Sequence, residues 1–290
     1  MVYLVDTLKL PPKASEGAEG GISVLGWSLG AHLPIGLLSS ASSLSIQVQE
    51  RLHGYLRSVV LLGMELQFVS VYSLSFSCLQ PDPSIYSIGL PIPPIVYSPE
   101  RPKGLHWLDF DQSLSPEERQ RQQVTWGSSY FQPTEDISTL TLTKLGERLT
   151  VQDLSEEVFS RLNIEPWKKV PTLLRFEPQE LSTIILPEAA ARSYQTLCLV
   201  DSSVHRSSFD RAIGLADSLP SDGLLVWPEC KLLYVWCDMT VVDCTIAASG
   251  VATIFKDHEG NIKRQVIMEK LPGANHFVSR LSHWAVQKDN

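Results

Sequence analysis

Short apolar runs alternate with longer amphipathic segments at both ends of the chain. Apolar runs of about four to eight residues are typical of strands that are buried on both faces of a parallel sheet. They predict four principal strands, around residues 22–26, 57–62, 231–237 and 263–269. Since right-handed crossovers make such strands parallel, the pattern indicates an α/β fold with a mainly parallel sheet.

The segments between these runs carry apolar residues at helical spacing, which is typical of helices that cover a sheet. The first helix is expected to end at Pro11 and Pro12, because proline cannot continue it. The expected helices are residues 2–10, 29–40, 46–56, 207–219 and 242–254.

The pattern changes between residues 86 and 190, where proline-rich sequence leads to segments with helix start signals. Three of these signals are Ser115, Thr150 and Pro187. We expect a helical cap insertion over residues 86–190, set in a core formed by residues 1–85 and 191–290. An independent helical domain is the alternative interpretation.

The sequence Gly26-Trp27-Ser28-Leu29-Gly30 joins the first apolar run to the helix that follows it. G-x-S-x-G between a strand and a helix is typical of a sharp turn that presents a nucleophilic serine on strained backbone. We expect glycine at both flanking positions, because side chains there would collide with the strand or the helix. Ser28 is therefore the candidate nucleophile.

A serine hydroxyl needs a base to accept its proton, and an imidazole titrates near the working pH. His276 follows the last apolar run within Gly-Ala-Asn-His-Phe and is the candidate base. His32 lies one helical turn after Ser28 and is expected to pack near the site. Structural roles are expected for His53, His106, His205 and His258.

The candidate serine lies early in the chain and the candidate histidine lies near its end. This order is one of the features by which the chain resembles the α/β-hydrolase superfamily, of the AB hydrolase-1 type. Its uncharacterised single-domain fungal members share Gly-Trp-Ser-Leu-Gly, an Asp-Pro pair after the next strand and a late Gly-Ala-Asn-His-Phe. The resemblance implies a partial α/β-hydrolase fold, with a helical cap that covers the serine. It implies a serine hydrolase that acts on an ester, thioester or amide through an acyl-enzyme, with the N–H of Leu29 as an oxyanion donor and without a cofactor.

The acid of the implied catalytic triad is open. The superfamily often has G-x-x-D after the penultimate strand, whereas this chain has Cys237-Asp238-Met239-Thr240. The candidates, in order, are Asp238, Asp243 and Asp82. That none of them reaches the histidine is a further alternative.

The resemblance also implies about four strands ahead of the serine turn, where this chain has about twenty residues. We therefore expect a core truncated at the N-terminus, an incomplete oxyanion hole and an unpaired edge at the serine strand. Residues 63–80 follow no helical or alternating pattern, and we interpret them as a translated, unspliced intron. The alternative function is an inactive remnant of the fold or a binding protein, from an incomplete gene model.

Composition agrees with a globular enzyme, because 290 residues that are 43% hydrophobic can bury one large core. A net charge of −8 excludes the basic face that nucleic acid requires. The expected partner is a small, apolar substrate, because the cap region is rich in aromatic residues: Trp107, Trp126, Tyr130, Phe131 and Trp167. Nothing in the composition sets the oligomeric state.

Five cysteines without regular spacing are typical of reduced thiols. Cys237, Cys244 and His276 lack the clustered spacing of a zinc site, so no metal is expected. The first residues lack the basic start of a signal peptide, so we expect a cytoplasmic protein. Residues 59–79 have about the length of a membrane span but contain Glu65, so no span is expected.

Overall fold

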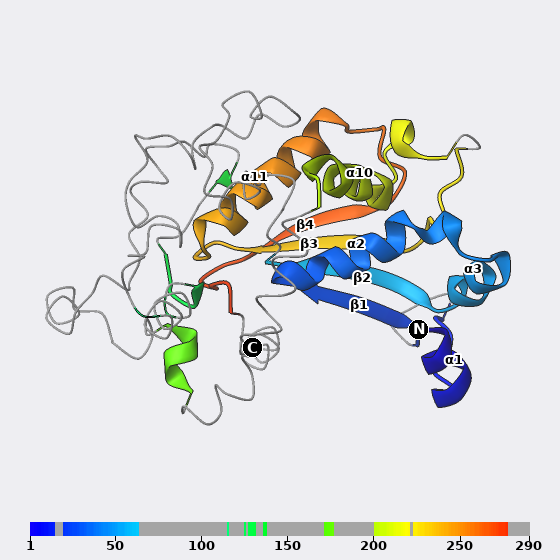
Figure 1. Ribbon diagram of the computed structural model, residues 1–290, viewed down its shortest axis with the longest axis horizontal. Coiled ribbons are helices and arrows are strands. Elements are labelled where there is room, and N and C mark those ends of the chain that lie inside the picture. Colours follow the sequence, from blue (N-terminus) through cyan, green and yellow to red (C-terminus); the bar gives the residue numbers. More distant parts are fainter. Residues whose placement is uncertain are drawn as a thin grey trace, which may run out of the picture. The chain divides into compact units, whose positions relative to one another are not determined.

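The computed structural model describes residues 1–14, 20–63, 115, 125, 127–131, 136, 137, 171–176, 200–220 and 223–277. The described residues contain a four-stranded sheet in the order β1-β2-β3-β4 (Figure 1). The strands are Ile22–Trp27 (β1), Leu56–Leu62 (β2), Lys231–Cys237 (β3) and Val266–Leu271 (β4). The predicted α/β class is confirmed, with strands close to the expected ranges.

The hydrogen bonds between neighbouring strands set the direction of the sheet. β1 pairs with β2 in parallel, with Val24 opposite Val59, and β2 pairs in parallel with β3. Between β3 and β4, the N–H of Leu232 donates to Gln265 and that of Asp238 donates to Leu271. Residue numbers rise together along both strands, so the fourth strand is parallel as well.

The start of β4 differs from the prediction, which began this strand at residue 263. The N–H groups of Lys263 and Arg264 donate instead to the carbonyls of Gly214 and Ile213, at 2.9 and 3.2 Å. These two residues therefore bond to the end of a helix, and the strand begins at Val266.

The described helices are Val2–Leu8 (α1), His32–Ser39 (α2), Ile46–His53 (α3), Ser202–Ile213 (α10) and Val242–Asp257 (α11). The range predicted for α10, 207–219, was about one and a half turns too late in the chain. The helix begins earlier because the Asp201 side chain accepts the N–H of Ser203 at 2.8 Å. It ends at Gly214, whose φ of 72° is the left-handed conformation that closes a helix.

The chain divides into two compact units, which are described separately. The first consists of Met1–Leu90, Tyr194–Val235 and Gly250–Glu269. Within it, α2 and α10 lie side by side over the sheet (Figure 1). Buried side chains of both helices and of β2 belong to the core, which includes Ile35, Leu38, Val59, Leu61, Phe209 and Ile213. β1 is an edge strand among the described residues, with Leu25 54% exposed.

The second unit consists of Pro91–Ser193, Trp236–Ser249 and Lys270–Asn290. Its described residues connect through the backbone: the N–H of Phe131 donates to Met239, and that of Thr172 donates to Ser128. Most of the predicted cap, with Thr150 and Pro187, lies outside the described residues, as does the proposed intron after Gly63. The domain boundaries stay a prediction.

No helix in the described part of the chain is long and apolar enough to cross a membrane.

Candidate active site

Ser28 begins the short 3₁₀ helix Ser28–Ala31 (η1) directly after β1. Its φ of 54° is in the left-handed region, which L-residues other than glycine rarely adopt. Gly26 permits the turn, because a Cβ built there would lie 2.6 Å from Cα of Ala31 and 2.7 Å from the carbonyl oxygen of Gly30. The predicted strained serine turn is present.

The expectation for Gly30 was wrong. A Cβ at this position would meet no atom of the described residues within 4 Å, and its φ is not positive. The chain has already turned into η1 at Gly30, so a side chain there would meet none of the described residues. Only the first glycine of the motif is required by a close approach.

His32 begins α2, one turn after Ser28, and it contacts a second histidine. The rings of His32 and His205 have centroids 4.8 Å apart and are tilted by 57°. His205 comes from α10 and is only 8% exposed. The sequence could not pair these residues, because their contact depends on how α2 packs against α10.

Asp238 directly follows β3 in the second unit and is buried at 6% exposure. Its Oδ1 accepts the N–H of Gly273 at 2.7 Å, which links the end of β3 to the turn after β4. Burial raises the pKa of the Asp238 carboxyl, while the Gly273 hydrogen bond and the charge of Lys270 act in the opposite direction.

His276 lies in the loop after β4 and is held by its neighbour in the chain, Asn275. The buried Nδ2 of Asn275 donates to the carbonyl of Ser128 and to Oγ1 of Thr172, the second at 2.8 Å. Its Oδ1 accepts the N–H of Phe277 at 3.1 Å. This amide therefore ties the histidine loop to two other segments of the second unit.

The His276 ring is buried at 9% exposure, and its Nδ1 lies 3.3 Å from the Sγ of Cys244. Cys244 comes from α11 and is 2% exposed, in a cluster with Phe131 and Val241. A triad would place its acid at the ring nitrogen that faces away from the serine. At Nδ1 the structure describes a thiol contact, whereas the sequence pattern grouped Cys244 with His276 only as a zinc site that lacked the right spacing.

The acid therefore stays a prediction. The described side-chain bond of Asp238 goes to Gly273. Asp82 and the side chain of Asp243 lie outside the described residues. The cysteine could have been found from sequence only by placing α11 against the loop after β4.

Of the aromatic residues expected to line a substrate pocket, Phe131 is fully buried against Val241 and Cys244. The hydroxyl of Tyr130 lies 3.3 Å from Oγ1 of Thr172. Both therefore contribute to internal packing in the second unit. The three tryptophans lie outside the described residues, so an apolar substrate stays a prediction: Trp107, Trp126 and Trp167.

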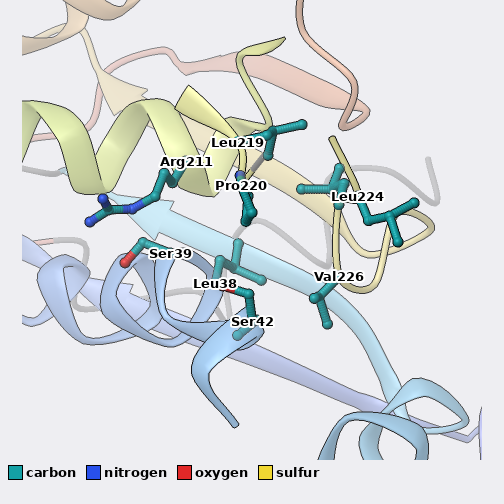
Figure 2. Close-up of a pocket in the computed structure, with 10 residues that line it drawn as sticks. Leu38, Ser39, Ser42, Arg211, Leu219, Pro220, Leu224 and Val226 are labelled. Carbon is teal, nitrogen blue, oxygen red and sulfur yellow. The ribbon is translucent and has the colours of Figure 1, made fainter. Parts of the chain in front are cut away.

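A pocket in the first unit lies between the end of α2, α10 and the segment around residues 219–226 (Figure 2). Apolar side chains line most of it, with Arg211 and two serines at its edge. Its cavity volume of about 20 Å³ is far below the range of about 300–1,000 Å³ typical of ligand sites. None of the predicted catalytic residues lines it, so it is not the candidate active site.

The described residues contain no group of three His, Cys, Asp or Glu side chains that could hold a metal ion. In comparisons with known proteins, no protein-family model, no curated protein and no solved structure matches the chain. The likeness to the α/β-hydrolases therefore rests on the motifs around Ser28 and His276.

Proposed function

We propose that this protein is a serine hydrolase that cleaves an ester, thioester or amide through an acyl-enzyme. The observation that carries the proposal is the left-handed backbone of Ser28 at the turn between β1 and η1. Such a conformation costs about 1–2 kcal/mol for an L-residue other than glycine. Strain of this kind gathers at functional sites, and here it falls on a side chain that can act as a nucleophile.

In the proposed reaction, His276 accepts the hydroxyl proton while Oγ of Ser28 attacks the carbonyl carbon of the substrate. The N–H of Leu29 donates to the oxyanion that forms. The intermediate then collapses, and the leaving group departs with the proton held by His276. A water molecule, deprotonated by the same imidazole, then attacks the acyl carbon. The bond between this carbon and Oγ breaks, the carboxylic acid leaves, and the imidazolium returns its proton to Oγ of Ser28.

The direction of the strands supports this assignment of roles. Parallel strands end at the same edge of a sheet, where α/β proteins place their sites. Ser28 follows β1, Asp238 follows β3 and His276 follows β4 within a few residues. We expect Ser28 and His276 to lie within hydrogen-bond reach or one water apart, and this separation is a prediction.

The second candidate is a catalytically inactive protein of the same fold that binds a ligand. The observation that favours it is the contact of His276 Nδ1 with a cysteine at the position where a carboxylate would be expected. A base without an acid to stabilise its charged form would be weaker.

A fluorophosphonate probe separates these candidates, because it labels an activated serine. We expect one adduct on the folded full chain, and peptide mapping should assign it to Ser28. Labelling should disappear in S28A and fall strongly in H276A, while a heat-denatured sample should not react. A folded sample that stays unlabelled would contradict the hydrolase and favour the binding protein.

A further inference from the structure

A thiol and an imidazole face each other in the second unit. Nδ1 of His276 lies 3.3 Å from Sγ of Cys244, a distance at which sulfur takes part in a hydrogen bond. Both side chains are at least nine-tenths buried, so water does not compete strongly for this contact.

We propose that Cys244 is the positioning residue of His276. The sulfur accepts a hydrogen bond from Nδ1–H, which fixes the tautomer of the ring that keeps the lone pair on Nε2. That lone pair is what a general base needs, because it takes the proton of the nucleophile. The inference rests on the proposed function, in which His276 is the base for Ser28.

Both partners are held by structure that leaves them little freedom. Cys244 belongs to the 16-residue helix α11 and packs with Phe131 and Val241. His276 follows Asn275, whose three hydrogen bonds anchor the loop. The Phe277 ring, nearly perpendicular to the imidazole and with its centroid 5.4 Å from that of His276, restricts the imidazole further. A pair fixed from both sides can set the orientation of a ring.

Asp238 has a structural role beside this pair. Its Oδ1 accepts the N–H of Gly273, and Gly273 has a φ of 73° in the turn after β4. Asp238 therefore stabilises the turn that leads into the histidine loop. At the ring itself, the described contact of Nδ1 is with Sγ of Cys244, at 3.3 Å.

The test measures the tautomer of His276 by ¹⁵N NMR of the full chain with labelled histidine, and the rate of ester hydrolysis beside it. In the wild type we expect the proton on Nδ1. Cys244→Ala should change the Nδ1 and Nε2 shifts and lower kcat by at least about tenfold, with KM nearly unchanged. The loss could approach the ~10⁴-fold drop seen when a triad acid can no longer fix the tautomer.

Two further variants separate positioning from packing. Cys244→Ser keeps an oxygen that can accept from Nδ1–H, so it should retain the wild-type tautomer and more activity than the alanine variant. Cys230→Ala removes another buried thiol, which has no described contact with His276, and should leave both readouts unchanged. Circular dichroism of each variant checks that it folds.

The inference is overturned if Cys244→Ala folds and leaves the His276 shifts and kcat as in the wild type. If Ser28 is labelled in the same experiments, the serine hydrolase proposal is supported and Cys244 has no positioning role in it. If the shifts change in Cys244→Ala while the fluorophosphonate never labels Ser28, the pairing stands and the hydrolase fails.

Discussion

Gly26 and Ala31 approach each other so closely that a Cβ on Gly26 would lie 2.6 Å from the Cα of Ala31. Backbone atoms cannot move aside to relieve such a contact, whereas the end of a flexible side chain can. The contact therefore holds the chain in the turn that presents Ser28, and it makes the residue at position 26 a test of the turn itself.

Gly26→Ala should destabilise the protein by about 1–3 kcal/mol, because the new methyl group overpacks the turn. The matched control is Gly30→Ala, where the described residues leave room for a methyl group and φ is not positive. It should be neutral or stabilising by up to about 1 kcal/mol. Urea unfolding of both variants checks this, and equal losses of stability would contradict the geometry of the turn.

Ser28→Gly should raise the free energy of unfolding by about 1 kcal/mol, because glycine adopts a φ of 54° without steric cost. The same change should abolish labelling by the fluorophosphonate. Ser39→Gly at the last residue of α2 is the control and should lower stability by about 0.5–1 kcal/mol, because it removes the hydrogen bond from Oγ to the carbonyl of Gly36 and frees the unfolded backbone. If Ser28→Gly destabilises the chain as Ser39→Gly does, strain is not stored at Ser28.

Arg264 is buried at 2% exposure, and its guanidinium donates to four backbone carbonyls: Ala212, Val226, Trp227 and Cys230. Arg264→Ala should cost at least about 3 kcal/mol, because it leaves these acceptors without their donor. Arg264→Lys should also be destabilising, since an ammonium cannot reproduce the planar fork. Arg51→Ala, which breaks an exposed ion pair with Asp6, should cause no measurable change. Chemical denaturation of the three variants compares them.

Asp238→Asn tests the buried carboxyl. Burial raises the pKa of Asp238 in the folded protein above its ordinary value of 3.8. At a pH between 3.8 and the raised pKa, the folded protein binds more protons than the unfolded chain. Stability therefore falls as pH rises through that window. Asparagine cannot ionise, but its Oδ1 can still accept the N–H of Gly273. The variant should be more stable than the wild type at neutral pH, and the difference should vanish below pH 3.8.

Unfolding curves at a series of pH values measure this difference, and a variant less stable at neutral pH would contradict it. The activity of the same variant separates the two candidate partners of His276. A loss of about 10⁴-fold would identify Asp238 as the acid of a triad. Activity close to the wild type agrees with Cys244 as the positioning residue.

The sheet could be predicted from sequence because each strand contains a short apolar run, and the turn at Ser28 because its motif is local. Element ends were less predictable where they depend on distant partners. β4 starts late because Lys263 and Arg264 bond to the end of α10. No pattern around residue 263 carries that information.

The site was predictable only in part for the same reason. Ser28 carries a local signal in its flanking residues, whereas the neighbours of His276 come from other segments. Cys244 lies on a helix and Thr172 reaches the loop through Asn275. The motif of the α/β-hydrolases directs attention to an aspartate after β3, and a thiol on α11 has no motif of its own.

The central claim is that Ser28 forms a covalent acyl intermediate with the help of His276. Brief incubation of the full chain with an activated acetate ester, acid quenching and mass spectrometry of the digested protein test it most directly. We predict one acetyl group on the peptide that contains Ser28, formed rapidly in the wild type, slowly in H276A and not at all in S28A. Turnover without an acylated Ser28, or acetylation that is equal in wild type and S28A, would contradict the account.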